Sequence, residues 1–396
     1  MPGLNRPRTL LVHNFYQRRG GEDAVVEAEA ELLSSQGHEV RLYGRHSSEI
    51  GAHPRLGLAR DVVWSRRTAR ELAALAASFR PQVIHVHNVF PLVSPAVFWI
   101  GRSLSVPVVQ TLHNFRLLCP EGTFLRDGRI CEDCLGRVPW RAVWHGCYRG
   151  SVPQSAALTA SITLHRAAGT YPGRVARFIA LTQFARAKFV AGGLPPERIA
   201  VKPNFVDVER PDEGPRSGAL FVGRLSREKG IDVLLRAVAM LPDLELTVVG
   251  DGPERAPEVP VRTRWLGALP HAEVIERMRE AACLVLPSIC FEGFPRTIVE
   301  AFACGLPVIA SRLGPLPEIV EDSRTGLLFE AGSAEDLARC LRQVRDSPAA
   351  CRRMGENARQ VYEARYTPQS NYASLLNVYN QAAEAVSAST ARIEAQ

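Results

Sequence analysis

The sequence has no apolar run long enough to cross a bilayer. Apolar stretches such as ALFVG, LTVVG and CLVLP have the length of strands, and no stretch approaches the ~20 residues that a membrane-spanning helix needs. The first residues, MPGLNRPRTLLVHN, lead directly into a strand pattern without the apolar core of a signal peptide. We therefore expect a cytoplasmic protein.

Two familiar binding signatures are missing as well. No run of lysine and arginine with interleaved aromatic residues occurs, so we expect no nucleic-acid site, even though residues 1–205 carry 26 basic and 14 acidic residues, a net charge of +12. Residues 206–396 carry 22 basic and 27 acidic residues, a net charge of −5. The basic half is typical either of a solvated surface or of one that faces phosphorylated ligands or anionic lipid. The G-x-G-x-x-G fingerprint is also absent, which argues against an ordinary dinucleotide site.

What the sequence does contain is a repeated alternation of short β-branched runs and longer amphipathic stretches. With 396 residues, 46% of them hydrophobic and 22% charged, the chain suits two soluble domains of roughly 150 to 200 residues each. Strand patterns occur at TLLVHN, HEVRLYG, QVIHVHN, PVVQTLHN, RFIALT and IAVKPN, and again at ALFVGR, LELTVVG, RWLG, CLVLPS, PVIAS and GLLFE. Helical patterns lie between them. We predict two α/β domains with parallel sheets, at residues 1–203 and 204–366, whose strand ends face a central cleft.

Two loops after predicted strands are candidates for binding an anion. NFYQRRGGED places Gly20 and Gly21 before a helical pattern, which suits either close approach of a phosphate to the helix N-terminus or a simple tight turn. FVGRLSREKGID places Arg224 and Lys229 after a strand. A guanidinium fork and an ammonium there would suit a diphosphate, although such cations are also commonly just solvated.

The stretch SICFEGFPRTIVEAFACG holds two carboxylates, Glu292 and Glu300, among apolar and small residues. Pro295 fits the first position of a helix, which would leave Glu292 in the preceding loop and Glu300 about one and a half turns inside. The N–H groups of Arg296 and Thr297 would then point at an anion, and Glu300 could accept hydrogen bonds from hydroxyl groups. The alternative is one acid that favours the helix dipole and one glutamate on the helix surface.

Taken in order, these stretches together with VIHVHN, TLHN and VVGDGPE resemble the family 4 glycosyltransferases, which have the GT-B fold of two Rossmann-like domains. The resemblance covers nearly the whole chain. It implies retaining transfer of a sugar from a UDP- or GDP-linked donor to a hydroxyl acceptor, as in bacterial cell-surface polysaccharide or glycolipid assembly. It also implies that residues 367–396 form a helix that packs back on the N-terminal domain, and that catalysis requires no cofactor.

The resemblance also implies a role for each site residue. Glu300 would bind the ribose of the donor, and Glu292 would contact the donor sugar near its reacting centre. Arg224 and Lys229 would hold the diphosphate and stabilise its growing negative charge, in place of the metal ion that other transferases use. His113, in TLHN, would lie near the sugar and contact a hydroxyl group or the acceptor.

Gly20 and Gly21 would let the N-terminal domain approach the diphosphate. One departure affects the donor site, because relatives commonly have Gly-Leu after EGF whereas this chain has Pro295 and Arg296. The change removes one amide donor and adds a cation that could reach either phosphate or acceptor. Two alternatives to a transferase remain, a nucleoside-diphosphate-sugar 2-epimerase of the same fold and a catalytically inactive protein that binds sugar nucleotides.

Four of the nine cysteines fall within 29 residues, in an insertion at residues 115–150. Cys131 and Cys134 form a C-x2-C pair flanked by Cys119 and Cys147. This set is consistent with a structural tetrahedral zinc site or with four reduced thiols packed under a loop. A catalytic metal is not expected, because four thiolates leave no open coordination position.

The insertion follows His113 directly, so we expect it to border the acceptor side of the site. Trp140 and Trp144 precede SVPQSAALTASITLHRAAG, a stretch of helical length. Such a basic and aromatic rim suits a lipid-linked acceptor and peripheral contact with the inner membrane face. An ordinary amphipathic helix packed on the sheet is the alternative explanation.

Overall fold

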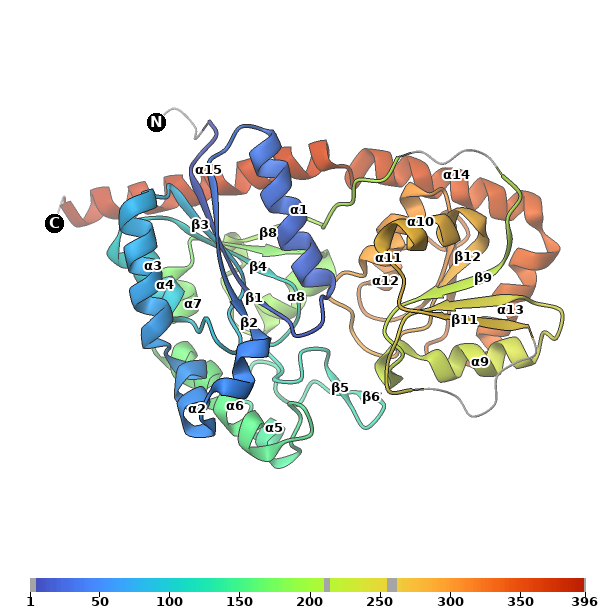
Figure 1. The fold of residues 1–396 in the computed structure, drawn as a ribbon, viewed down its shortest axis with the longest axis horizontal. Helices are drawn as coiled ribbons and strands as arrows, with labels where there is room; N and C mark the ends of the chain where they lie inside the picture. The colour runs from blue at the N-terminus through green and yellow to red at the C-terminus, as the bar shows by residue number, and fades with distance from the viewer. Residues whose placement is uncertain (1–4, 210–213, 255–261, 395–396) are drawn as a thin grey trace. The chain divides into compact units, whose positions relative to one another are not determined.

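Two parallel β-sheets, one in each of two units, organise the chain (Figure 1). The computed structural model describes residues 5–209, 214–254 and 262–394. Unit 1 comprises Met1–Gly122, Glu132–Asn204 and Gln369–Gln396, and unit 2 comprises Thr123–Cys131 and Phe205–Pro368.

The border between the units follows Asn204, one residue beyond the boundary placed from the sequence. One segment of the insertion, Thr123–Cys131, groups with unit 2 rather than with the N-terminal domain. The reason lies in its contacts, because the N–H of Phe291 donates to the carbonyl oxygen of Thr123 at 3.1 Å. The ring of Phe124 also packs against that of Phe291, with 5.8 Å between their centroids.

Unit 1 has a six-stranded parallel sheet in the order β2-β1-β3-β4-β7-β8. The strands are β1 (Thr9–Phe15), β2 (Val40–His46), β3 (Val83–Asn88), β4 (Val108–Leu112), β7 (Arg177–Ala180) and β8 (Ile199–Val201). The helices are α1 (Gly21–Ser35), α2 (Arg55–Val63), α3 (Arg66–Phe79), α4 (Ala96–Ser103), α5 (Trp140–Trp144), α6 (Val152–Ala167), α7 (Thr170–Arg174), α8 (Gln183–Ala191) and α15 (Pro368–Glu394). The central strands β1, β3 and β4 are buried along almost their whole length, as apolar runs in a covered parallel sheet should be.

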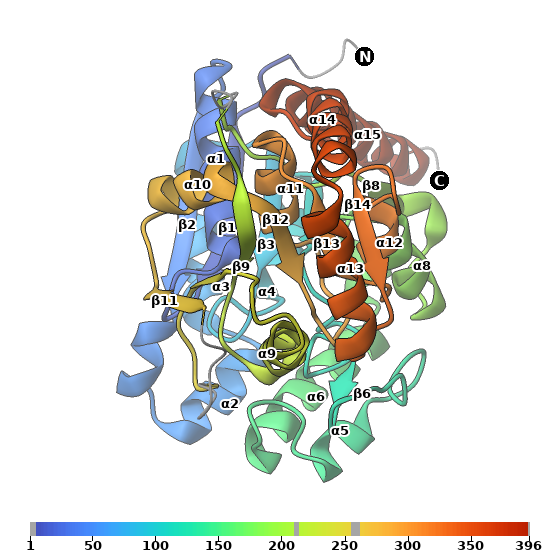
Figure 2. The same cartoon turned by 90° about the vertical axis from the view of Figure 1, so that its right-hand side faces the viewer.

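Unit 2 has a second six-stranded parallel sheet in the order β11-β10-β9-β12-β13-β14. The strands are β9 (Ser217–Val222), β10 (Leu246–Val249), β11 (Thr263–Gly267), β12 (Ala281–Leu286), β13 (Val308–Ser311) and β14 (Gly326–Phe329). The helices are α9 (Ile231–Ala239), α10 (His271–Glu280), α11 (Arg296–Ala303), α12 (Leu316–Ile319), α13 (Ala334–Asp346) and α14 (Pro348–Arg365). The helices α9 and α13 pack side by side (Figure 2).

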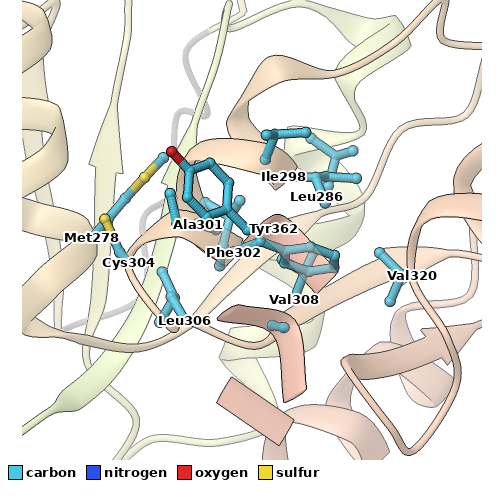
Figure 3. Close-up of a cluster of buried hydrophobic side chains, with 14 of the residues drawn as sticks. Met278, Leu286, Ile298, Ala301, Phe302, Cys304, Leu306, Val308, Val320 and Tyr362 are labelled. Carbon is cyan, nitrogen blue, oxygen red and sulfur yellow. The ribbon is translucent and has the colours of Figure 1, made fainter. Parts of the chain in front are cut away.

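Each face of the unit 2 sheet has its own apolar core. Successive residues of a strand point to opposite faces, so Leu220 of β9 belongs to one core and Phe221 to the other. Figure 3 shows the first core, where Met278 of α10, Phe302 of α11 and Tyr362 of α14 pack together. This packing anchors α11, so the polar residues of its first turns are held at the end of the sheet.

All twelve strand patterns read from the sequence appear as strands of the two sheets. Residues 62–79 read as one helical pattern in the sequence, but the helix is interrupted after Val63. Ser65 caps α3 there by accepting a hydrogen bond from the N–H of Thr68 at 3.3 Å. A short antiparallel hairpin of β5 (Leu125–Arg126) and β6 (Arg129–Ile130) was not predicted, because two-residue strands have no readable period. Within the part of the chain that the structure describes, no helix is long and apolar enough to cross a membrane.

Candidate functional site

Most of the predicted site residues follow strands at or beside the point where the strand order of each sheet reverses. In unit 2, β9 lies between β10 and β12, and in unit 1, β1 lies between β2 and β3. Ligands of open parallel sheets bind beyond the carboxyl ends of the strands at this point. The loops that carry predicted site residues are those after β9 and β12 in unit 2, and those after β1 and β4 in unit 1, where β4 is the second strand from β1.

In unit 2, Glu292 from the loop after β12 forms an ion pair with Lys229 from the loop after β9. The Lys229 Nζ lies 2.7 Å from Oε1 and 2.9 Å from Oε2 of Glu292, and Ser288 Oγ donates to the same Oε1 at 2.5 Å. The two charged side chains keep 27% and 10% of their surface exposed. Burial would lower the pKa of Lys229, but the Glu292 carboxylate raises it above its ordinary value, so the ammonium stays charged.

The backbone at Gly230 holds these two loops together. The 3-10 turn Arg227–Lys229 ends at Gly230, whose φ of 68° is left-handed. A Cβ at this position would lie 1.9 Å from the carbonyl oxygen of Pro287, so glycine is required for the loop after β9 to approach the end of β12. The N–H of Ile289 also donates to the carbonyl oxygen of Glu228 at 3.0 Å. The position of Lys229 is therefore fixed by the backbone around it.

Glu300 lies inside α11 and is 6% exposed. Its Oε1 is 3.5 Å from Nη2 of Arg296, one turn earlier, and 3.9 Å from Nδ1 of His271 on α10. The helix begins at Arg296, so Pro295 precedes the helix with an extended ψ of 104° rather than occupying its first position as predicted. In the described residues the N–H of Thr297 donates to no backbone carbonyl, as the anion-binding prediction requires.

Arg224 follows β9 by two residues and its side chain is exposed. Its guanidinium makes no hydrogen bond or ion pair with the rest of the described chain. Arg224 and Lys229 are therefore two cations at the same strand end, one exposed and one paired to a carboxylate. Two cations of this kind match the charge of a diphosphate.

In unit 1, Asp23 shapes the loop that contains Gly20 and Gly21. Its carboxylate accepts hydrogen bonds from the N–H of Gly20 at 2.8 Å and from the N–H of Tyr16 at 3.3 Å, and lies 2.8 Å from Nε2 of His13. Burial would raise the pKa of Asp23, but the contacts with His13 and Gly20 hold it below its ordinary value. A Cβ on Gly21 would meet no atom within 4 Å, so this helix start opens onto free space rather than onto packed protein.

His113 follows β4 and is 7% exposed. Its Nε2 lies 2.9 Å from Nδ1 of His87, at the end of β3, and the two rings stack with centroids 5.2 Å apart. Burial lowers the pKa of both imidazoles, that of His87 well below its ordinary value, so both rings are neutral near pH 7.

Glu22 joins the glycine loop to the TLHN loop. Its carboxylate accepts hydrogen bonds from Nδ2 of Asn114 at 2.7 Å and from the hydroxyl of Tyr16 at 2.8 Å. Arg116 lies close by, and although burial would lower its pKa, the neighbouring Tyr16 and Glu22 raise it. A cleft borders these residues and is lined by His87, Gln110, His113, Asn114 and Arg116 among others.

The sequence reasoning missed this polar framework of unit 1. Asp23 and Glu22 looked like ordinary acids in the first turn of a helix. Glu29 is fully buried although it lies in an amphipathic helix, and the signal was available, because Glu29 occupies the same stripe as Val25, Val26 and Leu33. The two histidines of VIHVHN are spaced two residues apart on a buried strand, which places both on one face.

The four cysteines of the insertion divide between the units. Cys131 lies in the segment that groups with unit 2, and Cys119, Cys134 and Cys147 lie in unit 1. None of them, all within the described residues, forms a disulfide. Cys119 and Cys134 are buried, and Cys131 and Cys147 are half-buried. The zinc site stays a prediction.

The helix predicted after the insertion is α6, and it packs against α2 and α5 within unit 1. Its buried side includes Leu158 and Ile162, as expected for an amphipathic helix inside a fold. The exposed aromatic residues lie instead on α5, where Trp140 is 58% and Trp144 is 79% exposed. The guanidinium of Arg141 lies over the Trp140 ring, 5.7 Å from its centroid.

Comparison with known proteins identifies the family. Residues 19–210 match the family described as Glycosyltransferase Family 4, and residues 208–361 match the family described as Glycosyl transferases group 1. The two matches overlap at residues 208–210, shortly after the border between the units at Asn204. Together the two matches cover residues 19–361, and they bear out the resemblance of the motifs to glycosyltransferase family 4.

Individual relatives also match the chain, over different shares of its length. The chain is 34% identical to glycogen synthase of Mycobacterium tuberculosis over 182 residues, which cover 43% of this chain and 44% of that protein. It is 24% identical to the sulfoquinovosyl transferase SQD2 of Arabidopsis thaliana over 358 residues, 88% of this chain and 65% of that protein. The chain thus spans less than half of the first of these relatives and about two thirds of the second.

The fold is shared with solved structures. The Anabaena protein HepE in complex with UDP matches with a TM-score of 0.66 at 18% identity, covering 96% of this chain and 100% of that chain. Together with the two parallel sheets described above, this likeness identifies the GT-B fold, which confirms the prediction.

Proposed function

We propose that this chain is a retaining glycosyltransferase that moves a sugar from a UDP- or GDP-linked donor to a hydroxyl acceptor. The observation that carries the proposal is the Lys229–Glu292 pair at the point of strand reversal in unit 2, with the exposed cation of Arg224 at the same strand end. Membership of the family and the likeness to a UDP-bound neighbour support a nucleotide ligand. As in other members, we infer that no metal ion is required for the transfer.

In the proposed reaction, the diphosphate binds to Arg224 and Lys229 and displaces Glu292 from the ammonium. When the bond between the sugar and the diphosphate breaks, its electron pair stays on the phosphate oxygen, and the two cations stabilise that charge. The acceptor hydroxyl bonds to the sugar from the side on which the diphosphate leaves, and its proton passes to the departing phosphate oxygen. The configuration of the sugar is then retained.

The remaining site residues bind and orient the donor. Glu300 accepts hydrogen bonds from the ribose hydroxyls, and Glu292, once released, accepts one from the donor sugar. On α11, Arg296 and the N–H of Thr297 contribute positive potential. On unit 1, Gly20 and Gly21 leave room for a phosphate at the start of α1, and His113 contacts a hydroxyl group of the sugar or the acceptor.

Calorimetric titration of UDP and GDP tests the donor site. We expect one nucleotide to bind and the Arg224→Ala, Lys229→Ala double variant to lose about 100-fold or more in affinity, because each charge-assisted contact contributes about 1.5–3 kcal/mol. The matched control is Arg352→Ala, Arg353→Ala, which removes two exposed cations of α14 in the same unit. If neither nucleotide binds the intact protein, or both double variants lose affinity equally, the donor assignment is wrong.

A second assay separates the transferase from a 2-epimerase. A transferase releases the nucleoside diphosphate in an acceptor-dependent manner, whereas an epimerase changes the sugar without any acceptor. Screening UDP- and GDP-sugars with hydroxylated and lipid-linked acceptors gives one pattern or the other. Nucleotide binding without either reaction would favour a sugar-nucleotide-binding protein that is catalytically inactive.

We further propose that the acceptor is lipid-linked, in cell-surface polysaccharide or glycolipid assembly, and that α5 contacts an anionic membrane surface. Trp140 and Trp144 are exposed beside basic residues, which is the composition of interfacial helices. Co-sedimentation with vesicles containing anionic lipid, at low salt, should decrease for Trp140→Ala, Trp144→Ala but not for Met240→Ala, which removes an exposed apolar residue of unit 2. Absence of binding by the intact protein would rule out the contact.

The cysteines Cys119, Cys131, Cys134 and Cys147 are proposed to bind a structural zinc ion. The support is the C-x2-C spacing with two flanking thiols. Metal analysis of protein purified without chelator should give one zinc ion per chain, and Cys131→Ser, Cys134→Ser should lose it, whereas Cys283→Ser in the β12 core should retain it. Protein without zinc that keeps its activity and stability would favour packed thiols.

A further inference from the structure

A row of buried polar side chains in unit 1 leads from the interior to His113. Nζ of Lys202 lies 2.6 Å from Oε1 of Glu29, and Oε2 of Glu29 lies 3.5 Å from Nε2 of His87. Nδ1 of His87 lies 2.9 Å from Nε2 of His113. We call these four residues the buried histidine chain. Lys202, Glu29 and His87 are at most 4% exposed, so bulk water does not reach them.

Two atoms of the chain have no hydrogen-bond partner among the described residues, namely Oε2 of Glu29 and Nε2 of His87. They face each other, and at 3.5 Å their arrangement depends on where the hydrogen of His87 lies. A bare Nε2 would direct its lone pair at a carboxylate and cost free energy, whereas an Nε2–H is attracted to it. Lys202 keeps Glu29 ionised, because although burial would raise the pKa of Glu29, Lys202 lowers it below the ordinary value. His87 therefore carries its hydrogen on Nε2.

This assignment also determines which ring nitrogen of His113 carries the hydrogen. A neutral His87 with hydrogen on Nε2 has a bare Nδ1, which can only accept a hydrogen bond. The nitrogen 2.9 Å away, Nε2 of His113, must then be the donor and carry the hydrogen of that ring. His113 is left with a bare Nδ1, and no group of the described residues forms a hydrogen bond with that atom. The ring lines the cleft after β4, where a ligand hydroxyl would find an acceptor.

A metal ion is the competing explanation for the same atoms. The ligand atoms of Glu29, His85 and His87 lie within 4.8 Å of one another. The ammonium of Lys202 already neutralises the carboxylate at 2.6 Å, so a divalent ion would place like charges close together in a buried site. His85 is also held by other groups, with its ring nitrogens 2.9 Å from the hydroxyl of Tyr379 and 2.7 Å from Oγ1 of Thr111. A proton network fits this arrangement better than a cation.

We propose that Glu29 is a positioning residue that acts through His87 to hold His113 with a bare Nδ1, ready to accept a hydrogen bond from a hydroxyl group of the substrate. The inference deepens the proposed function and rests on it for the identity of that hydroxyl group. The placement of the hydrogens, however, is a property of the protein alone. It can be measured without substrate.

Nitrogen-15 NMR of protein labelled at its ten histidines tests the hydrogen positions directly. Protonated and bare ring nitrogens of a neutral imidazole have well-separated shifts, and His87→Gln and His113→Gln variants assign the signals. We expect hydrogen on Nε2 and a bare Nδ1 for both His87 and His113. Hydrogen on Nδ1 of His113 in the intact protein would overturn the proposal whatever the activity.

Replacing the Glu29 carboxylate should move the hydrogen of both His87 and His113 to the other ring nitrogen. The double variant Glu29→Gln, Lys202→Met removes both buried charges, and the amide nitrogen introduced in place of the carboxylate can donate to Nε2 of His87, so both histidines should carry hydrogen on Nδ1. The matched control is Tyr379→Phe, which removes a partner of His85 but leaves the buried histidine chain intact. Unchanged histidine shifts in the double variant, or shifts of His85 and His87 on adding Zn²⁺ that disappear without Glu29, would contradict the proposal.

Kinetics separate this proposal from the proposed function. With an active donor and acceptor pair, Glu29→Gln, Lys202→Met should lower kcat on the order of 10- to 100-fold, as misoriented acceptors do, while the Kd for the nucleotide stays unchanged because Arg224 and Lys229 are untouched. An unchanged kcat with reversed hydrogens would show that the orientation of His113 does not matter. The expected NMR result without any transfer activity would instead count against the proposed function alone.

Discussion

The part of the chain that the structure describes contains three lysine–glutamate ion pairs, and two of them, one in each unit, lie in opposite settings. In unit 1, Lys202 and Glu29 are 2.6 Å apart and each is 1% exposed. In unit 2, Lys229 and Glu292 are 2.7 Å apart but 27% and 10% exposed. The first pair is enclosed by Asn371, which accepts a further hydrogen bond from Lys202 at 3.1 Å. The second lies at the carboxyl ends of β9 and β12.

The difference teaches that distance alone does not tell what an ion pair does. Removing one partner of a pair that is fully withdrawn from water is costly, so such a pair serves the fold and the groups it touches. A pair whose cation is partly exposed can exchange its carboxylate for a ligand phosphate. Only the second pair is suited to substrate binding.

Breaking the buried pair should have the largest effect. Glu29→Gln leaves the Lys202 ammonium buried without a counter-charge, and we expect a loss of about 3–5 kcal/mol in the free energy of unfolding of unit 1. Urea unfolding followed by tryptophan fluorescence measures it, because Trp64, Trp99, Trp140 and Trp144 all lie in unit 1. The matched change Glu292→Gln should cost less, because part of the Lys229 side chain still reaches water. Equal losses in the two variants would remove the distinction between the pairs.

Acid should weaken unit 1 through the same cluster. Burial lowers the pKa of His85 from its ordinary value of 6.5 to about 4. In the unfolded chain this histidine gains a proton near pH 6.5, whereas in the folded chain it does so only near pH 4, so stability is lost as the pH falls through that window. Replacing His85 with Gln should make the pH dependence of the urea midpoint less steep there, while His87 and His113, whose pKa burial also lowers, keep the rest of the slope. Replacing the exposed His145 should leave the slope unchanged. If the pH dependence of the urea midpoint is unchanged in the His85→Gln variant, groups other than His85 cause it.

Removing the Glu292 carboxylate should free the Lys229 ammonium to bind phosphate. In Glu292→Gln, Lys229 no longer has a competing partner for phosphate, so we expect UDP or GDP to bind with equal or up to about tenfold higher affinity. The transfer rate should fall, since the sugar loses a contact. Calorimetry and a release assay on one preparation measure both. A large loss of nucleotide affinity would mean that Glu292 itself binds the nucleotide or shapes the loop.

The smallest expected effect comes from Tyr379 of α15, the helix that covers the buried Lys202–Glu29 pair. Tyr379→Phe removes one neutral hydrogen bond to His85 and should cost about 1 kcal/mol in the unfolding of unit 1. Leu375→Ala, one turn earlier on α15, removes a fully buried side chain and should cost about 2–5 kcal/mol. A Tyr379→Phe cost equal to that of Leu375→Ala would mean that His85 depends on this hydroxyl far more than a single neutral bond implies.

Sequence patterns predicted the sheets well and the site unevenly. The strands were readable because covered parallel strands are continuous apolar runs, and the residues of the donor site were readable because a family motif carries them. Lys229 and Glu292 were both chosen, yet their mutual ion pair was not foreseen, since it joins loops 63 residues apart. The buried histidine chain was invisible for a related reason, because Glu29, His87 and Lys202 come from α1, β3 and the end of β8, and only the folded sheet brings them together. The left-handed turn at Gly230 likewise depends on a carbonyl from another strand.

The course of α15 has a consequence for synthesis on the ribosome. Unit 1 contains both the first strand and the last helix of the described chain, and Asn371 and Tyr379 of that helix close over Lys202 and His85. During translation, Glu29 and Lys202 emerge long before their cover does. Unit 2, apart from its short segment Thr123–Cys131, is one continuous stretch, so it can finish folding first. The nascent protein would then mature in the reverse of the usual N-terminal-first order, with its buried charges hydrated until the final helix docks.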